Sequence, residues 1–275
     1  MNVQLTVVVP AYNEEGMLVP MAERLVPWLD LVVGPGGWQI LVVDNGSTDG
    51  TAAEIAEMNE RWHACEAIFL ENPDVGAAFR AGLLNAAGEW AHIINVDFWD
   101  GVFFAWSWLK RDQYQLLLGS KRADLSIDRR SRYRRILTWG LNVVLRHSFG
   151  SVCTDTHGPK LLHLPSMRQL IKETELSRGQ FDTEFTLRAF RAGLRTAEAP
   201  IPMEETRPPR NLMLTKIVRN LYDVARLHRV MKAVPVTGPI RYHRWARDDM
   251  VEEVAKHYGV RGGVVIEPDQ LAAHS

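Results

Sequence analysis

The chain has 275 residues, of which 46% are hydrophobic and 24% are charged, and its formal net charge is −1. This length and apolar fraction predict one large folded domain, or one domain with an extension. A net charge near zero provides no global field that would attract nucleic acid, so we expect no nucleic-acid partner.

Cysteine usage and the N-terminal residues point to the compartment. Cys65 and Cys153 are far apart and fit no metal-binding spacing, which is typical of free thiols in a reducing environment. The N-terminus leads directly into a predicted strand without a charged leader, and no apolar run is long enough to span a bilayer. We therefore expect a cytoplasmic protein whose contact with a membrane, if it has any, is peripheral.

The first 120 residues alternate between predicted strands and helices. Residues 5–9 and 39–43 are almost entirely apolar, as is typical of parallel strands buried on both faces. Further strands are predicted at 66–70 and 90–96, and helices at 14–30, 50–62 and 75–87, the last ending at a Gly88 cap. This alternation predicts an α/β fold with a mostly parallel central sheet.

The second half is less regular. Strands are predicted at 115–118, 160–164 and 195–199, and helices at 131–148, 181–192, 212–232 and 247–258. The helix at 212–232 has an apolar stripe and five cations, which fit either a solvated face or contact with anionic headgroups: Lys216, Arg219, Arg226, Arg229 and Lys232. We place a catalytic domain at 1–210 and a helical extension at 211–275, for which membrane-surface contact and oligomer contact are both open roles.

Polar residues follow three of the predicted parallel strands. The first strand runs into Pro10-Ala11-Tyr12-Asn13-Glu14, the second into Asp44-Asn45-Gly46-Ser47-Thr48-Asp49, and the fourth into Asn95-Val96-Asp97-Phe98-Trp99-Asp100. Carboxyl ends of parallel strands lie at one edge of a sheet, which predicts a single binding crevice. Asn13 and residues 47–49 are also typical helix caps when taken alone, so the interpretation depends on their order along the chain.

These segments resemble family 2 glycosyltransferases of the GT-A fold, specifically the polyprenyl-phosphate (dolichyl-phosphate) mannose and glucose synthases. The matching stretches are VVVPAYNEE at 7–15, VVDNGSTDGT at 42–51, NPDVGAAFRAGLLNAAGEW at 72–90, IINVDFWD at 93–100, LLLGSKR at 116–122, DTHGPK at 155–160 and FDTEFTLRAFRAGLRTAEAPI at 181–201. The last two are typical of the synthase branch. The resemblance implies a Rossmann-like, mostly parallel sheet flanked by helices, with a helical C-terminal extension.

The resemblance also implies roles for individual residues. The nucleotide-binding set would be Pro10, Ala11, Tyr12, Asn13, Glu14, Asp44, Gly76, Arg80, Asn95 and Val96. Asp97 would be the metal-binding Asp of a D-x-D motif, with Asp100 as a second candidate ligand. Because the leaving group is a nucleoside diphosphate, we expect a hard divalent cation, Mg²⁺ or Mn²⁺, as cofactor.

The chain departs from the family pattern at three positions. Asn95 stands first in the D-x-D motif, and Asn45 replaces a frequent second Asp of the base-binding motif. Asp74-Val75-Gly76 replaces a common Gly-Lys/Arg-Gly, which removes a phosphate-side cation. The charge that Asn95 lacks would attract a divalent ion at about 4–5 Å by roughly 7 kcal/mol at an effective dielectric of about 20.

Acceptor-side residues are expected from the second half of the chain. Asp155 would orient the acceptor or act as a base, and it joins Asp97 as a predicted catalytic residue. Cations that would hold the two phosphates close are Lys121, Arg132, Arg135, Lys160 and Arg210. Since a polyprenyl phosphate oxygen is already anionic near neutral pH, positive charge matters more here than a dedicated base.

The sequence therefore predicts an enzyme that moves a hexose from a GDP- or UDP-sugar to a polyprenyl phosphate, with inversion as the family implies. Two alternatives stay open. One is a family 2 transferase with a glycan or small-molecule acceptor, and the other is a nucleotide-sugar-binding protein without turnover, which Asn45, Val75 and Asn95 motivate. Homo-oligomers are compatible with each of these readings.

Overall fold

The computed structural model describes residues 2–124, 149–202 and 213–258 and the single positions 140, 143 and 146, without the side chains of residues 178 and 213–221. Its centre is a sheet with the strand order β3-β2-β1-β4-β6-β5-β7-β8. The strands are β1 (Leu5–Ala11), β2 (Trp38–Asp44), β3 (Cys65–Phe69), β4 (Trp90–Ile93), β5 (Leu116–Ser120), β6 (Lys160–His163), β7 (Arg195–Pro200) and β8 (Arg241–Arg244).

Strand direction decides where the loops gather. In this sheet β6 runs antiparallel to both of its neighbours, whereas all the other neighbouring strands run parallel. The carboxyl ends of β1, β2, β4, β5, β7 and β8 therefore lie at one edge. This arrangement confirms the predicted α/β fold with a mostly parallel sheet.

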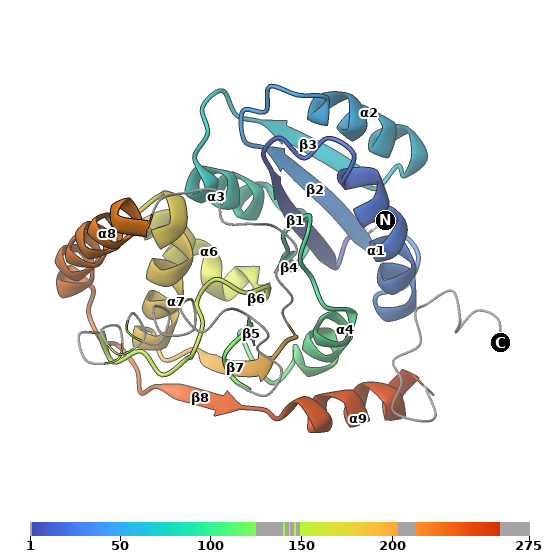
Figure 1. Cartoon of the computed structure of the whole chain (residues 1–275). Coiled ribbons are helices and arrows are strands. Elements are labelled where there is room, and N and C mark those ends of the chain that lie inside the picture. Colours follow the sequence, from blue (N-terminus) through green and yellow to red (C-terminus); the bar gives the residue numbers. More distant parts are fainter. Residues whose placement is uncertain are drawn as a thin grey trace.

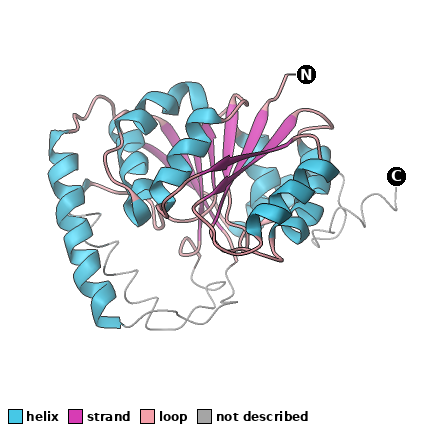
Figure 2. Ribbon diagram, turned by 90° about the horizontal axis from the view of Figure 1, so that it is seen from above, coloured by secondary structure: helices cyan, strands magenta, loops and turns pink. Residues whose placement is uncertain are grey.

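Helices cover both faces of the sheet (Figures 1 and 2). One face carries α1 (Leu18–Val32), α2 (Thr51–Arg61), α4 (Gly101–Lys110) and α9 (Arg247–Tyr258). The opposite face carries α3 (Val75–Asn85), α6 (Leu164–Glu173), the short turn η1 (Arg178–Gln180), α7 (Phe181–Arg191) and α8 (Met213–Ala233). Each layer has its own hydrophobic cluster against the sheet, so the core has two halves.

Two predicted helix boundaries are wrong for identifiable reasons. The first helix begins at Leu18, which places Pro20 in its first turn, where a missing backbone N–H costs little. Helix α3 ends at Asn85, before the predicted Gly88 cap. Gly88 instead lies against β1, because a Cβ there would stand 2.8 Å from the Thr6 nitrogen. The glycine allows the start of β4 to approach β1 closely.

Three elements were not predicted from the sequence. Helix α4 is buried along most of its length, so it lacks the polar stripe that marks a surface helix. Helix α6 starts at Leu164-Pro165, inside the segment predicted to end a strand. Strand β8 is short and mostly exposed, with a burial pattern that gives no clear alternation.

The C-terminal segment contains a strand as well as helices. Beyond residue 210, α8 packs on α7 through Leu227, Val230 and Met231, and it stands at the left edge of Figure 2. Strand β8 then pairs with β7, and α9 packs on α4. The described part of 211–275 therefore extends the main sheet. No helix among the residues described here is long and apolar enough to cross a membrane.

Helix α3 packs so closely on the sheet that position 82 tolerates only glycine. A Cβ at Gly82 would overlap the Val8 side chain and stand 3.1 Å from Cγ2 of Val43. We expect Gly82→Ala to destabilise the protein by about 1–3 kcal/mol, since overpacking forces the elements apart. Thermal unfolding measures this as a lowered Tm. Gly179→Ala, where a Cβ meets nothing within 4 Å, is the matched control and should leave Tm unchanged.

Candidate functional site

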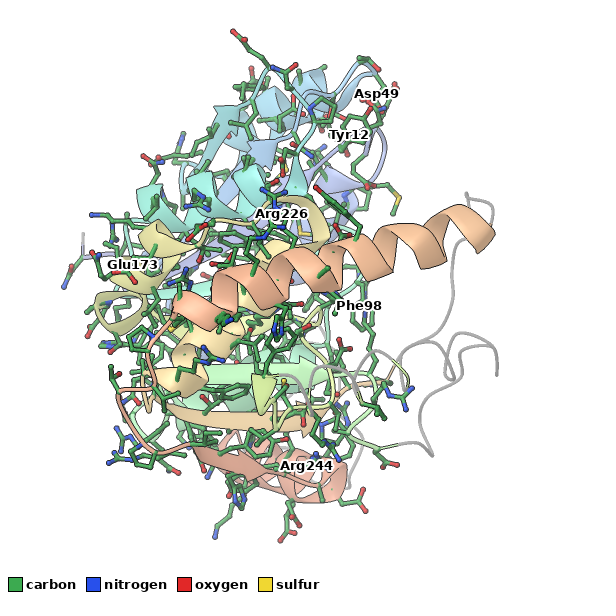
Figure 3. All side chains as sticks on the ribbon, turned by 90° about the vertical axis from the view of Figure 1, so that its left-hand side faces the viewer. Tyr12, Asp49, Phe98, Glu173, Arg226 and Arg244 are labelled. Atoms are coloured by element: carbon green, nitrogen blue, oxygen red, sulfur yellow. The ribbon has the colours of Figure 1, made fainter. Side chains whose placement is uncertain are left out.

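The candidate site lies at the carboxyl edge of the sheet, where β1, β2 and β4 end. Ala11 and Asp44 are register partners at the ends of β1 and β2, and the Asn45 amide donates to the Ala11 carbonyl at 2.8 Å. In Figure 3, Tyr12 and Asp49 lie together near the top of the view, Phe98 lies near its middle and Arg244 near its bottom. The predicted crevice residues of the first two strands are thus brought together.

Asn13 connects the loops after β1 and β2. Its φ of 54° is in the left-handed region, which Asn adopts more readily than most residues. Its backbone N–H donates to Ser47 Oγ at 2.9 Å, and its side-chain oxygen accepts from the Thr48 amide at 2.8 Å. The possible helix-cap role of Asn13 is therefore not realised. The network leaves the Tyr12 side chain at the rim, with 45% of its surface exposed.

Asp44 is buried at the base of this crevice, and one of its carboxylate oxygens accepts the Ser47 amide at 3.0 Å. Its neighbour Asn45 also has a defined partner, because the Asn45 side-chain oxygen accepts the Asp74 amide at 2.7 Å. The Asn that departs from the family pattern therefore links the β2 loop to the start of α3.

The side-chain carboxylate of Asp74 caps the N-terminus of α3. Asp74 accepts the Gly76 amide at 2.9 Å and the Ala77 amide at 3.1 Å. Such amides are the groups that would otherwise bind an anion at a helix N-terminus. Gly76 thus lies near the crevice with its N–H already engaged, and Asp74 accounts for the sequence change at this loop.

Arg80 is engaged with α6. Its guanidinium donates to the carbonyl oxygens of Ile171 and Lys172 at 3.2 Å and to that of Thr174, and it lies 5.5 Å from the centre of the Phe181 ring. A cation at these carbonyls stabilises the helix C-terminus. Because the side chain is used in this way, we leave Arg80 out of the proposed nucleotide site.

The D-x-D position forms a tight turn. Asn95 and Phe98 exchange backbone hydrogen bonds of 3.4 and 3.3 Å, so Val96 and Asp97 occupy the turn itself. Val96 is buried and Asp97 is exposed. The turn therefore presents the Asp97 carboxylate at the edge where the crevice opens.

Asp100 has structural partners instead of a metal. One oxygen accepts the Phe103 amide at 2.7 Å, which caps α4. The carboxylate also forms a two-pronged ion pair with Arg247, at 2.8 and 3.1 Å. A carboxylate held by an amide and a guanidinium has little capacity left for a cation, so we leave Asp100 out of the proposed metal site.

The remaining donor set fits a weakly held divalent ion. Within the described ranges, no group of three or more His, Cys, Asp or Glu side chains is placed to hold a metal. Asp97 supplies one carboxylate, and Asn95, two residues before it, carries an amide oxygen. Mg²⁺ commonly takes only one or two protein carboxylates and completes its shell from substrate phosphates and water.

Lys121 lies beside the D-x-D turn and contacts Asp155 through its backbone. The Lys121 ammonium lies 4.8 Å from the centre of the Phe98 ring, next to Asp97 in sequence. The Lys121 amide donates to Asp155 at 3.4 Å, and the His157 amide donates to the other Asp155 oxygen at 2.9 Å. The structure therefore brings one predicted cation to the D-x-D turn and holds the predicted acceptor-side carboxylate at the backbone of that cation.

The other predicted cations are placed differently. Lys160 is 1% exposed, and its ammonium donates to Asp182 at 3.0 Å and to the Gly158 carbonyl at 2.8 Å. It is a buried structural ion pair, and the prediction that it reaches a substrate phosphate gains no support. Arg132, Arg135 and Arg210 lie outside the described residues, as does most of the helix predicted at 131–148.

One relevant residue was missed by the sequence reading. Glu198 lies in β7 with 0% of its surface exposed, and it accepts the backbone amides of Thr154 and Asp155. The available signal was a single carboxylate inside a short predicted strand. Buried carboxylates are rare without partners, so this residue merited a functional interpretation.

Comparisons with known proteins bear on the class of this site. The family model described as glycosyl transferase family 2 matches residues 6–100. The chain is 27% identical to a dolichyl-phosphate beta-glucosyltransferase of Trichomonas vaginalis, over 82% of this chain and 73% of the relative. It is 25% identical to a dolichyl-phosphate beta-glucosyltransferase of Saccharomyces cerevisiae, over 73% of this chain and 67% of the relative.

Solved structures show the same fold. Glucosyl-3-phosphoglycerate synthase from Mycobacterium tuberculosis aligns with a TM-score of 0.54 at 18% identity, over 86% of this chain and 82% of that chain. A mannosyltransferase from Pyrobaculum calidifontis, solved with GDP-Man and Mn²⁺, aligns with a TM-score of 0.53 at 18% identity, over all of this chain and 79% of that chain.

The fold and these similarities together identify a glycosyltransferase enzyme with the α/β GT-A fold. More particularly, residues 6–100 match the family 2 glycosyl transferases, and the chain is similar to the polyprenyl-phosphate sugar synthases, as its sequence motifs predicted.

The buried ion pair beneath the 155–160 loop gives a test of its structural role. Burial alone would raise the pKa of Asp182, but Lys160 and His157 lower it below its usual value. The pair therefore stabilises the fold above pH about 4, and this contribution is lost as pH falls through the folded-state pKa of Asp182.

We expect Lys160→Met to destabilise the fold by about 3–5 kcal/mol at pH 7, because the buried Asp182 loses the ammonium that compensates its charge. The difference from wild type should narrow in acid, where protonation removes that charge. Urea unfolding at pH 7 and pH 4 measures both effects. The double variant Lys160→Met/Asp182→Asn should recover part of the loss. A deficit that does not change with pH, or no recovery, would contradict this assignment.

Proposed function

We propose that this enzyme transfers a hexose from a nucleoside-diphosphate sugar to a polyprenyl phosphate. Similarity to the dolichyl-phosphate glucosyltransferases supports the acceptor, because it covers 82% of the chain and extends past the matched residues 6–100. The observation that carries the proposal is the position of the Lys121 ammonium, 4.8 Å from the Phe98 ring of the turn that exposes Asp97, while the Lys121 amide contacts Asp155.

The donor would bind across the ends of β1 and β2. Tyr12 presents an exposed ring on which a base can stack, while Asp44 presents a buried carboxylate that can accept from a base N–H or a ribose hydroxyl. The Asn13 cross-link fixes the two loops relative to each other before a ligand arrives. Such preorganisation lowers the entropy lost on binding.

The diphosphate would lie next to the turn at residues 95–98. Asp97, assisted by the Asn95 amide oxygen, would hold a Mg²⁺ or Mn²⁺ ion. When bound, this ion supplies the positive charge that stabilises the departing diphosphate. Because Asn95 contributes no charge, the protein neutralises less of the ion's charge than a site with two carboxylates would. The substrate diphosphate would then neutralise the rest.

Lys121 would hold the acceptor phosphate against the donor. Two phosphate groups repel each other, and an ammonium between them lowers the work of bringing them together. An anionic oxygen of the acceptor phosphate attacks C1 of the sugar as the bond from C1 to the diphosphate oxygen breaks, and the diphosphate leaves with that electron pair. A single displacement of this kind inverts C1 and needs no proton transfer.

The acceptor class is tested by a transfer assay with the full chain. Radiolabelled UDP-glucose or GDP-mannose is supplied with Mg²⁺ or Mn²⁺ and either a polyprenyl phosphate in detergent or a water-soluble glycoside. We expect label from one donor to enter the organic phase only when the polyprenyl phosphate is present. Label that enters only the soluble glycoside would favour the alternative transferase with a non-lipid acceptor.

The role of Asp97 is tested by calorimetric titration with GDP and UDP, each with Mn²⁺, Mg²⁺ or EDTA. We expect one nucleotide to bind in a metal-dependent manner, and Asp97→Ala to weaken that binding by roughly 100-fold, because the ion loses its carboxylate. Asp112→Ala is the control, since Asp112 is an exposed carboxylate that lines a hollow at the opposite edge of the sheet. Equal, metal-independent binding by wild type and Asp97→Ala would refute the proposed ion site.

A further inference from the structure

We infer that Glu198 is a positioning residue for the acceptor side of the site, and that β8 belongs to the same machinery. Glu198 acts by holding the loop that carries Asp155 in register with Lys121. The inference rests on the proposed function to the extent that this loop is proposed to meet the acceptor.

One oxygen of Glu198 fixes the loop. Oε1 accepts the Thr154 amide at 2.7 Å, the Thr154 hydroxyl at 2.8 Å and the Asp155 amide at 3.2 Å. Three donors from two consecutive residues leave the loop little freedom to shift. Glu198 thereby fixes the backbone of Asp155. The carboxylate oxygens of Asp155 accept the Lys121 and His157 amides.

The other oxygen of Glu198 reaches β8. Oε2 accepts from the Tyr242 hydroxyl and forms an ion pair of 3.3 Å with Nε of Arg244. Burial and the Glu198 charge raise the pKa of Tyr242, so its hydroxyl remains a donor at neutral pH. Because Tyr242 and Arg244 come from the last strand of the sheet, Glu198 connects the acceptor loop to the C-terminal segment.

A second contact links the loop at Thr154 to the strand that ends immediately before Lys121. The hydroxyls of Ser120 and Thr154 lie 2.7 Å apart, and Ser120 ends β5 immediately before Lys121. Thr154 therefore sits between Glu198 and the strand that delivers the proposed phosphate-binding cation. Displacement of Thr154 would move Asp155 and Lys121 together.

A purely structural role does not account well for this carboxylate. A fully buried charge is costly to desolvate, and an apolar side chain of similar size would often be as stable in a strand interior. Here five donors converge on it, and three of them belong to the loop of the proposed acceptor site. A buried polar network of this kind is most useful to a protein where it fixes the position of reactive groups.

The test compares Glu198→Gln with Thr196→Val, a near-isosteric change of a buried residue that lies two positions earlier on the same face of β7. The glutamine keeps one acceptor oxygen but presents an NH₂ group to donors. For transfer from the labelled sugar nucleotide to a polyprenyl phosphate in detergent, we expect kcat/KM for the acceptor to fall by roughly 10- to 100-fold. The Kd of the nucleotide should stay within about twofold of wild type, since the crevice of β1 and β2 is unchanged.

Hydrogen exchange provides a readout that does not depend on the acceptor. We expect amides of residues 151–158 to exchange faster in Glu198→Gln, while those of β1 and β2 keep their protection. If Glu198→Gln fails to fold, Tyr242→Phe decides the question. It removes one hydroxyl from β8, leaves the loop sequence intact, and should lower acceptor kcat/KM by roughly 3- to 10-fold.

The outcomes separate the two proposals. If Glu198→Gln and Tyr242→Phe match Thr196→Val in acceptor kinetics and in exchange of residues 151–158, the role of Glu198 is refuted. A loss of nucleotide affinity as large as the loss in acceptor kcat/KM would also refute it, because the proposed role of Glu198 affects only the acceptor loop and not the nucleotide crevice. If wild type transfers only to a water-soluble acceptor, the proposed acceptor is wrong, and the same comparison made with that acceptor decides the role of Glu198.

Discussion

The parallel pairing of β1 with β2 and β4 is the constraint on which the rest of this structure depends. Because all three strands point the same way, segments that are more than 30 residues apart in sequence end side by side at one edge. The antiparallel β6 then allows β5, β7 and β8 to run in the same direction as β4 on its far side. The loops proposed to bind the donor and the acceptor therefore share one edge of the sheet with the D-x-D turn.

The loops at that edge hold one another in place. Asn13 joins the loops after β1 and β2, and Asn45 joins the second of these to Asp74 at the start of α3. The Asn45 side chain holds the backbone of Asp74, whose carboxylate in turn caps α3. These contacts fix the geometry of the loop before a ligand binds.

The C-terminal segment supports the loop that is proposed to meet the acceptor. Strand β8 supplies Tyr242 and Arg244 to Glu198, and α9 supplies Arg247 to Asp100 at the start of α4. Glu198 accepts the backbone amide of Asp155, and Asp100 lies three residues after Asp97. The C-terminal segment is thus built into the support of the proposed site.

The sequence by itself determined the fold class, the order of strands and helices as far as β4, and the polar segments that follow β1, β2 and β4. These features follow from local apolar runs and short polar motifs, which act over a few residues. The tertiary structure alone decided that Arg80, Asp100 and Lys160 have structural partners and that Glu198 lies beneath Asp155. Each of these outcomes depends on contacts between residues at least 22 positions apart, which no local pattern encodes.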